Sequence, residues 1–323
     1  MRDHGGDLDR ARARFGGDDW IDLSTGINPV AYPVPDVLPA RALAALPTAE
    51  DIAGLADAAR RAYATSLVPV PLAGAQAAIQ IVPRLSAVGR ARVLVPTYNE
   101  HAGALAASGW QVAEVREPDA LEGADLAVVV SPNNPDGRRA SVSDLVALAG
   151  RVGLLVVDES FADPEPESAL SRAEVPENVV ILRSFGKFYG LAGLRLGFAL
   201  AAPDMAARIA ALAGPWAVSG PAIAIGTRAL GDTAWRDETR ARLRVDAARL
   251  DGLAEWAGWR LVGGTPLFRT YETGDAASAQ ERLARARIWS RIFPYSEGWM
   301  RLGLPGDAAG WARLETALSG GGE

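Results

Sequence analysis

The segment Ser184-Phe185-Gly186-Lys187 is followed, eight residues after the lysine, by Arg195 in Gly193-Leu194-Arg195-Leu196-Gly197. A lysine amine can condense with an aldehyde cofactor when it is held close to that cofactor and is partly deprotonated. The Ser184 hydroxyl and the Arg195 guanidinium could hold a phosphate group of the same cofactor. This combination indicates pyridoxal phosphate. Taken alone, the segment is also compatible with a glycine-rich loop that carries one solvated lysine.

Short apolar runs on both sides of this segment predict the strands of a buried sheet. The runs are continuous rather than alternating, which is typical of strands buried on both faces. They cover residues 93–95, 126–130, 154–157, 179–182 and 194–200. Alanine-rich helical patterns lie between them at 100–108 and 142–149, and Ser141 or Ser143 could cap the second. This alternation predicts a mostly parallel, right-handed α/β sheet that binds ligands at the carboxyl ends of its strands.

The last third of the chain has a different pattern, which predicts a separate α+β domain. Arginine-rich helices are expected at 205–213 and 237–256, and strands at 259–262, 267–271, 288–293 and 299–304. The first 45 residues contain Pro29, Pro33, Pro35 and Pro39 and predict an extended surface arm. We therefore expect an N-terminal arm over residues 1–45 that packs with the small domain, a cofactor-binding large domain over 46–213 and a small C-terminal domain over 214–323.

Two groups near the first predicted strands suit a pyridoxal phosphate site. Gly74-Ala75-Gln76 precedes an apolar helical stretch, so its backbone amides could bind a phosphate at a helix N-terminus. A glycine that opens a helix is nevertheless commonplace. Tyr98, in Pro96-Thr97-Tyr98-Asn99-Glu100-His101, follows the run at 93–95 and could stack on a pyridine ring. It could also be an aromatic residue that covers the core.

Two polar side chains follow the next two strands. Asn134, in Ser131-Pro132-Asn133-Asn134-Pro135-Asp136-Gly137, lies in a predicted tight turn and could direct its amide at the phenolic oxygen of the cofactor. Asp158 ends the apolar run at 154–157, and a carboxylate among apolar residues needs a cationic partner. A pyridinium nitrogen is such a partner, although Asp158 could instead cap a helix.

In sequence order, these motifs resemble the class I/II aminotransferase family over most of residues 20–305. The motifs are G-A-Q, P-T-Y-N-E-H, P-N-N-P-x-G, V-V-D-E-S-F, S-F-G-K-F-Y-G and G-L-R-L-G. The resemblance implies a fold-type-I pyridoxal phosphate enzyme. Such an enzyme has a three-layer α/β large domain with a mostly parallel sheet, a smaller α+β C-terminal domain and an extended N-terminal arm. It is usually a homodimer with active sites at the subunit interface.

The resemblance also implies a role for each motif. Lys187 forms the Schiff base with pyridoxal 5′-phosphate, Asp158 partners the pyridine nitrogen and Tyr98 stacks on the ring, which makes these three the catalytic candidates. Asn134 binds the phenolic oxygen. The cofactor's phosphate is held by Ser184, Arg195 and the loop formed by Gly74, Ala75 and Gln76.

Finer features resemble a subgroup, the threonine-phosphate decarboxylases of cobalamin biosynthesis. These features are His4-Gly5-Gly6, Ile27-Asn28-Pro29, Leu182-Arg183-Ser184 and Pro215-Trp216-Ala217-Val218. By the family match, Arg301 grips the substrate's α-carboxylate through its guanidinium fork, although the residues alone would fit a surface arginine on an edge strand. The expected substrate is a small phosphorylated amino acid, whose phosphate requires a second anion site. Candidates for that site are His4, Asn28 and Arg291.

The expected reaction is decarboxylation of L-threonine O-3-phosphate to (R)-1-aminopropan-2-ol O-2-phosphate. An aminotransferase of the histidinol-phosphate type is the first alternative, and a noncatalytic binding module with this fold is the second. Two departures from the family pattern affect the site. Phe161 stands where many members have a tyrosine, so Asn134 would bind the phenolic oxygen alone. Leu46-Pro47 lies where relatives often place a tyrosine that reaches the neighbouring subunit's phosphate.

Composition bounds the remaining classes of function. The 323 residues contain 33 Lys and Arg against 39 Asp and Glu, a formal net charge of −6, and the arginines are scattered, so no nucleic-acid partner is expected. Without cysteine there is no disulfide framework or thiolate metal site, and we expect no metal. No apolar run approaches membrane-spanning length, and the acidic start of the sequence has no signal-peptide core. A cytoplasmic protein with no membrane partner is expected.

Overall fold

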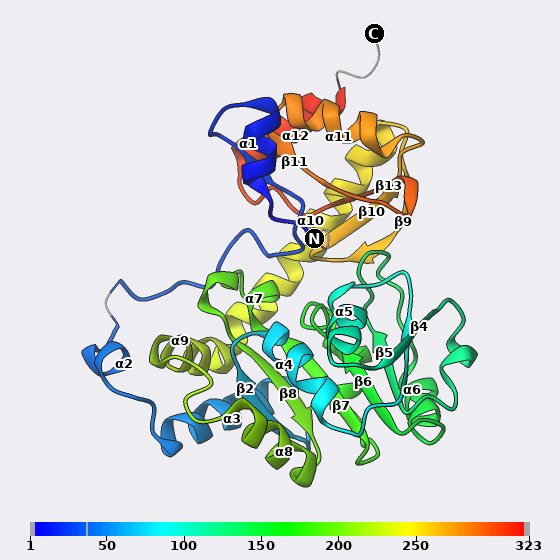
Figure 1. The fold of residues 1–323 in the computed structure, drawn as a ribbon. Coiled ribbons are helices and arrows are strands. Elements are labelled where there is room, and N and C mark those ends of the chain that lie inside the picture. The colour runs from blue at the N-terminus through cyan, green and yellow to red at the C-terminus, as the bar shows by residue number, and fades with distance from the viewer. Residues whose placement is uncertain (1–3, 37, 320–323) are drawn as a thin grey trace. The chain divides into compact units, whose positions relative to one another are not determined.

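The computed structural model describes residues 4–36 and 38–319, which divide into two compact units (Figure 1). Unit 1 contains the described residues up to Ala31, the segment Pro135–Arg138 and the described residues from Glu238 onward. Unit 2 contains the described residues of Tyr32–Asn134 and Arg139–Asp237. These limits differ from the predicted boundaries after residues 45 and 213. The division into an N-terminal arm, a large domain and a small domain therefore stays a prediction.

Unit 2 is built on a seven-stranded sheet in the order β2-β8-β7-β6-β5-β3-β4. Its strands are β2 (Val68–Leu72), β3 (Arg90–Leu94), β4 (Gln111–Val115), β5 (Leu126–Val130), β6 (Leu154–Asp158), β7 (Val179–Ser184) and β8 (Gly197–Ala201). Only β8 runs antiparallel to its neighbours, β2 and β7. The mostly parallel α/β sheet is therefore confirmed. The sequence patterns missed β2, whose Pro69 and Pro71 are tolerated because it is an edge strand.

Helices cover both faces of this sheet. On one face, α4 (Ala75–Ile81), α5 (Glu100–Ala107) and α8 (Pro203–Ala213) share a buried core with every second residue of the strands, including Val128, Val156 and Val180. On the other face, Tyr63 of α3 (Ala49–Tyr63) meets Phe198 of β8 edge to face, with ring centroids 5.8 Å apart. This is the expected three-layer arrangement. The sequence patterns predicted α5, α8 and the helix Val142–Ala149 (α6), but they did not predict α3.

The remaining helical segments of unit 2 are short or lie outside this core. They are α2 (Ala40–Ala44), α6 (Val142–Ala149), α7 (Phe185–Phe188), α9 (Gly220–Gly231) and 3-10 turns at Val82–Arg84, Pro118–Leu121, Pro166–Ser168, Leu170–Arg172 and Ala192–Leu194. Of the two serines proposed as the cap of α6, Ser141 is the one that accepts a hydrogen bond from the Asp144 amide, at 3.1 Å.

Unit 1 contains a four-stranded antiparallel sheet in the order β12-β13-β10-β9. Its strands are β9 (Arg260–Thr265), β10 (Phe268–Glu272), β12 (Arg291–Phe293) and β13 (Ser296–Leu302). A second sheet pairs β1 (Ile21–Asp22) in parallel with β11 (Ile288–Trp289), so the single strand expected at 288–293 is interrupted at Ser290. The helices are α1 (Leu8–Phe15), α11 (Ala276–Arg285), α12 (Ala308–Ser319) and most of α10 (Thr233–Trp256). The predicted α+β composition is confirmed.

The expectation of an extended arm is wrong for part of the N-terminal segment. Residues 8–15 form α1, whose N-cap Asp7 accepts a hydrogen bond from the Arg10 amide at 3.1 Å. Phe15 and Trp20 both lie against Trp289, with ring centroids 6.4 and 6.2 Å from it. Because Trp289 is about 270 positions further along the chain, the apolar surface that stabilises this helix is not visible in the local pattern.

No helix of the described residues has the length and apolar character needed to span a membrane. Within the same residues, no group of three or more His, Cys, Asp or Glu side chains could hold a metal ion.

Candidate active site

The register of the unit 2 sheet aligns the ends of the strands that carry the predicted residues. Val130 of β5, Asp158 of β6 and Leu182 of β7 are direct partners. Ser184 is the last residue of β7, and Lys187 follows it on α7. Because β5, β6 and β7 are parallel, their carboxyl ends lie at the same edge of the sheet. The predicted residues that follow these strands therefore share one edge of unit 2.

Asp158 forms a buried hydrogen bond with a residue that had no predicted role. Nε2 of His101 on α5 lies 2.8 Å from Oδ2 of Asp158, and both residues are at most 3% exposed. The Ser160 amide donates to the other carboxylate oxygen at 2.9 Å. Burial raises the pKa of Asp158, but the hydrogen bonds and charge of His101 and the Ser160 bonds outweigh it and hold this pKa below its ordinary value. Asp158 is therefore an ionised, oriented carboxylate.

A cradle for an anion forms where α4 begins. Gly74 has a positive φ of 82° at the N-cap of α4, and a Cβ at this position would lie 2.9 Å from Nη2 of Arg195. A Cβ at Gly197 would lie 2.4 Å from the Ala75 amide nitrogen, and Gly197 is paired with Ser184. Backbone amides, a guanidinium and a hydroxyl thus converge because two glycines permit close approach. This donor set suits a phosphate.

Lys187 does not lie in a solvated loop, so that interpretation of the segment is wrong. It is half-buried on α7, and its Nζ lies 5.6 Å from the centroid of the Phe161 ring. Rings on both sides of it fix the helix. Phe185 stacks on Tyr189 with centroids 4.2 Å apart, and Tyr189 stacks on Trp235 at 5.5 Å. The backbone that carries Lys187 is therefore held in place by aromatic packing.

Tyr98 and Gln76 lie together near the start of α5. The Tyr98 hydroxyl donates weakly to Oε1 of Gln76 at 3.4 Å, and Nε2 of Gln76 donates to Glu100 at 3.0 Å. The Tyr98 ring is half-buried and meets the His101 ring edge to face, with centroids 6.2 Å apart. Tyr98 therefore packs on the core and also adjoins the His101–Asp158 pair. Its stacking on a cofactor ring stays a prediction.

The turn that carries Asn134 is fixed by its neighbour. Asn133 donates from Nδ2 to the Pro96 carbonyl at 2.9 Å and accepts from the Thr97 hydroxyl at 2.6 Å. These bonds join the loop after β5 to the loop after β3. Asn134 follows at the limit of unit 2 and is half-buried. The sequence analysis missed the anchoring role of Asn133 because both asparagines fit the same turn.

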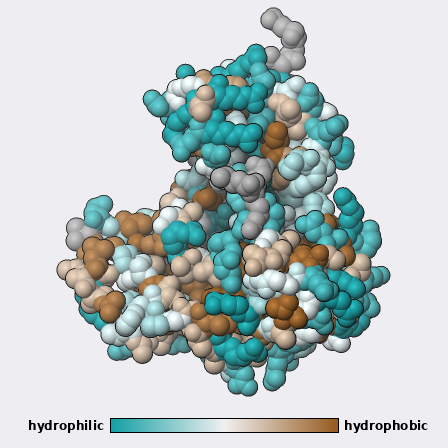
Figure 2. All heavy atoms as spheres, viewed as in Figure 1, coloured by the Kyte–Doolittle hydropathy of each residue, from teal (hydrophilic) through white to brown (hydrophobic). Residues whose placement is uncertain are grey.

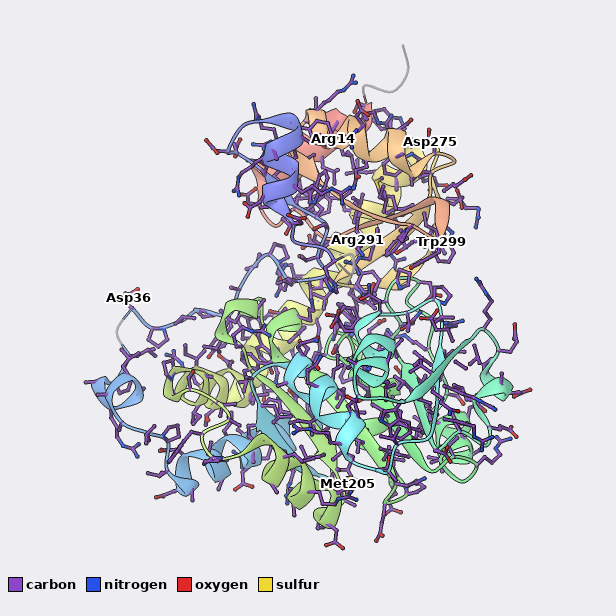
Figure 3. All side chains as sticks on the ribbon, in the orientation of Figure 1. Arg14, Asp36, Met205, Asp275, Arg291 and Trp299 are labelled. Atoms are coloured by element: carbon purple, nitrogen blue, oxygen red, sulfur yellow. The ribbon has the colours of Figure 1, made fainter. Side chains whose placement is uncertain are left out.

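Unit 1 contains a pair of arginines on neighbouring strands. Arg291 of β12 is directly opposite Arg301 of β13 (Figure 3 labels Arg291). Arg301 is 5% exposed, donates to the Ser24 carbonyl at 2.6 Å and lies over the Phe268 ring at 5.0 Å. Burial, followed by the charge of Arg291, lowers the pKa of Arg301 to about 10, so it is cationic at neutral pH. Like charges opposite each other are destabilising, and a bound anion would relieve the cost.

The alternative that Arg301 is a surface arginine on an edge strand is wrong, because β13 lies between β12 and β10 and the side chain is buried. The other two candidates lie in the same unit. Asn28 is buried, and its Oδ1 accepts from the Val30 amide at 3.1 Å and from Arg242 at 2.8 Å. The sequence analysis did not consider Arg242.

The exposed His4 belongs to a segment that packs beside the Arg301 contact. The Gly6 amide donates to the Ser24 hydroxyl at 2.7 Å. A Cβ on Gly5 would lie 2.4 Å from the Ser24 carbonyl oxygen, the same atom that accepts from Arg301. Gly5 and Gly6 therefore lie beside Ser24, whose carbonyl binds Arg301, while Asn28 is bound to Arg242.

The fold, with a seven-stranded mostly parallel sheet and a small antiparallel sheet, is that of the fold-type-I pyridoxal phosphate enzymes. Residues 46–314 match the sequence profile described as aminotransferase class I and II, and the chain belongs to this family. It is 44% identical to a threonine-phosphate decarboxylase of Sinorhizobium sp, covering 98% of this chain and 97% of the relative. A threonine-phosphate decarboxylase of Pseudomonas aeruginosa is 42% identical, covering 99% and 98%.

A solved structure confirms the fold independently. The histidinol-phosphate aminotransferase of Sinorhizobium meliloti, in complex with pyridoxal-5′-phosphate, aligns with a TM-score of 0.85 at 21% identity. The alignment covers 98% of this chain and 94% of that one.

Proposed function

We propose that the protein is a pyridoxal-phosphate-dependent lyase that decarboxylates L-threonine O-3-phosphate to (R)-1-aminopropan-2-ol O-2-phosphate in cobalamin biosynthesis. The observation that carries this proposal is the identity of 44% and 42%, over nearly the whole chain, to two threonine-phosphate decarboxylases. The arrangement of Lys187 and Asp158 in unit 2 supports it. A noncatalytic binding module would not need a half-buried lysine and a buried, ionised carboxylate at the same edge of the sheet.

The residues of unit 2 fit pyridoxal 5′-phosphate. The cradle of Ser184, Arg195 and the amides that follow Gly74 suits its phosphate, and the aldehyde requires an amine, which Lys187 supplies. Asp158, kept ionised by His101 and Ser160, suits a protonated ring nitrogen. When bound, the cofactor supplies an electron sink for the charge released at the substrate's Cα. We assign ring stacking to Tyr98 and the phenolic oxygen to Asn134.

The remaining steps depend on how the substrate's two anionic groups are held. We assign the α-carboxylate to Arg301, whose guanidinium fork suits a carboxylate, and the phosphate ester to Arg291, with His4 and Asn28 as further candidates. The way these groups are held decides whether the carboxylate or the hydrogen leaves Cα. Loss of the carboxylate gives carbon dioxide, and a proton returned to Cα completes the reaction. Lys187 Nζ is our candidate for moving a proton at Cα.

The decisive experiment is to incubate the purified protein and pyridoxal phosphate with threonine phosphate, without a keto acid, and to measure carbon dioxide. Release at a rate well above that of the Lys187→Ala variant is expected. If no carbon dioxide forms, while added 2-oxoglutarate allows amino transfer from histidinol phosphate, the protein is an aminotransferase instead. A wild-type protein that develops no visible absorbance with pyridoxal phosphate would favour the noncatalytic module.

The proposal includes a homodimer that acts in the cytoplasm. Hydrophobic side chains gather around α2 and α9, at the left of Figure 2. Among the residues on and near these helices, Leu43 is 72% exposed, Leu46 is 64% exposed and Trp216 is 56% exposed. Covering apolar surface of this kind stabilises association, and the family resemblance implies a dimer. Light scattering of the eluted protein would give twice the chain mass, whereas a monomer mass would contradict the proposal.

A further inference from the structure

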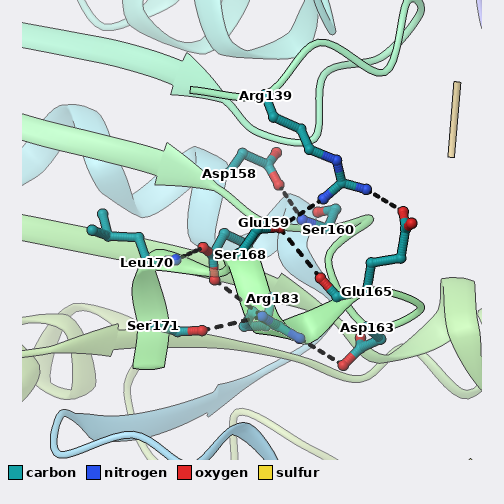
Figure 4. A network of polar contacts seen from close by, with 10 residues as sticks. All are labelled: Arg139, Asp158, Glu159, Ser160, Asp163, Glu165, Ser168, Leu170, Ser171 and Arg183. Atoms are coloured by element: carbon teal, nitrogen blue, oxygen red, sulfur yellow. Dashed lines mark hydrogen bonds and ion pairs between the residues drawn. The ribbon is translucent and has the colours of Figure 1, made fainter. Parts of the chain in front are cut away.

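A buried charge network lies beside the ends of β6 and β7 (Figure 4). Arg183, which is 1% exposed, donates from Nη1 to Glu159 at 3.0 Å and to the Ser171 hydroxyl at 3.2 Å. Its Nη2 donates to Asp163 at 2.6 Å. The second oxygen of Glu159 accepts from the Leu170 amide. One cation and two carboxylates are thus withdrawn from water and depend on one another.

This network lies on the opposite face of the sheet from the candidate cofactor site. Side chains alternate along a strand, so Ser184 shares the face of Val180 and Leu182, which pack in the core with α4 and α5. Arg183 points to the other face, where its guanidinium lies 4.3 Å from the centroid of the Tyr63 ring on α3. No proposed contact with the cofactor therefore involves Arg183 directly.

The covalent neighbours of the network are the site residues themselves. Glu159 directly follows Asp158, and Arg183 directly precedes Ser184. The Glu159 amide also donates to the Leu182 carbonyl at 2.9 Å, which extends the pairing of β6 with β7. The Arg183–Glu159 bond thus joins the two backbone segments that hold the candidate partner of the ring nitrogen and the candidate phosphate ligand.

We propose that Arg183 is a positioning residue that sets the affinity for pyridoxal phosphate by fixing the Asp158 segment relative to the Ser184 segment through Glu159. The inference rests on the proposed cofactor. A site that holds both ends of one rigid molecule tolerates displacements of only about 0.5 Å. A buried ionic bridge between the two segments limits such displacements.

The two carboxylates of the network have different roles under this proposal. Glu159 is the covalent neighbour of Asp158, whereas Asp163 lies four residues further along the chain than Glu159. Burial would lower the pKa of Arg183, but the charges of Asp163 and Glu159 outweigh it and raise this pKa. Both carboxylates therefore stabilise the buried cation, and Glu159 is the one that is covalently joined to Asp158.

The test compares Arg183→Lys, Glu159→Gln and Asp163→Asn with the wild type, using the apoprotein and pyridoxal phosphate as the ligand. The cofactor's dissociation constant is measured by absorbance titration, and stability is measured by urea unfolding of the apoprotein. We expect Arg183→Lys and Glu159→Gln to raise the dissociation constant about tenfold or more. Asp163→Asn, which retains an oxygen acceptor for Nη2, should lower the stability and leave the dissociation constant within about twofold.

Arg139→Met is the matched control. Arg139 donates to the Ser168 hydroxyl at 3.0 Å and pairs with Glu165 at the exposed side of the same region. The Arg139→Met variant should bind pyridoxal phosphate with the same dissociation constant as the wild type. Equal affinities of the folded Arg183→Lys protein and the wild type would overturn the proposal, as would equal losses in Asp163→Asn and Glu159→Gln. A wild type that does not bind pyridoxal phosphate would instead contradict the proposed function.

Discussion

Asp158 is a buried charge that is stabilised most strongly by one neighbouring ring, that of His101. His101 supplies the strongest contact that counteracts burial, and an ionised carboxylate buried without a donor is costly. Replacing His101 with phenylalanine leaves the burial and removes one of the two hydrogen-bond partners of Asp158. The carboxylate of Asp158 should then bind a proton more readily than in the wild type.

This change predicts a characteristic dependence of stability on pH for His101→Phe. In the wild type the folded pKa of Asp158 is lowered, so its stabilisation is complete above its unfolded pKa of about 3.9 and is lost only as pH falls through the folded pKa. In the variant we expect burial to outweigh the remaining Ser160 bonds and to raise the folded pKa of Asp158. We expect a deficit of about 1.5–3 kcal/mol at pH 7 that shrinks as the pH falls, because protonation removes the buried charge.

Urea unfolding between pH 4.5 and 7.5 measures this deficit. Because the replacement also removes an ionisable ring, it is made in Asp158→Asn as well, and the difference between the two backgrounds isolates the contribution of the His101–Asp158 pair. A difference that is constant over this pH range would contradict the prediction.

Gly197 matters for the space that it leaves. A Cβ there would lie 2.4 Å from the Ala75 nitrogen and 2.6 Å from the Gly74 carbonyl carbon, and both are backbone atoms that cannot turn away. Gly197→Ala should therefore push β8 from the start of α4, at a cost of about 1–3 kcal/mol in the free energy of unfolding. It should also weaken pyridoxal phosphate binding. Gly193→Ala is the control, because a Cβ there meets nothing within 4 Å; equal effects of both replacements would refute the argument.

At the scale of elements, α7 is too short to be stable without its surroundings. It has four residues, and the stack of Phe185, Tyr189 and Trp235 holds it in place. Trp235→Leu removes one face of this stack and an edge contact with Phe188, whose centroid is 5.6 Å away. We expect a loss of about 2–4 kcal/mol in the free energy of unfolding and a broadened visible band of the bound cofactor.

The control for this prediction is Trp256→Leu, at the other end of α10. Trp256 is 63% exposed, so its replacement should change stability by no more than about 0.5 kcal/mol. If both tryptophan variants unfold at the same urea concentration, the aromatic stack does not stabilise α7.

The sequence predicted those elements whose signal is local. Continuous apolar runs predicted β5, β6 and β7. Asp158 and Asn134 were predicted as candidate site residues because they follow two of these runs. The partners of these residues could not be predicted in the same way. His101 lies 57 positions from Asp158, and Phe15 of α1 lies far from Trp289. Such contacts form only after folding has brought distant segments together, so no local sequence pattern predicts them.

At the scale of the whole molecule, two kinds of ligand group are distributed between the two compact units. The residues proposed for the cofactor all belong to unit 2, and the arginines proposed for the substrate's anionic groups belong to unit 1. Mutations in the two units should therefore separate in their kinetic effects. A change in unit 2 should alter the cofactor's dissociation constant, whereas a change at the arginine pair should alter the use of substrate.

Arg291→Gln tests this separation, since it removes a charge from unit 1 and leaves Arg301 without its like-charged neighbour. Losing a charge-assisted hydrogen bond, worth about 1.5–3 kcal/mol, should raise the KM for threonine phosphate roughly ten- to a hundredfold. The dissociation constant of pyridoxal phosphate should stay unchanged. Ser184→Ala should do the reverse, with weaker cofactor binding and, at saturating cofactor, a nearly normal KM. If the Arg291→Gln protein has a wild-type KM, the assignment of the substrate's phosphate ester to Arg291 is wrong. His4, Asn28 and Arg242 would then be the residues to test.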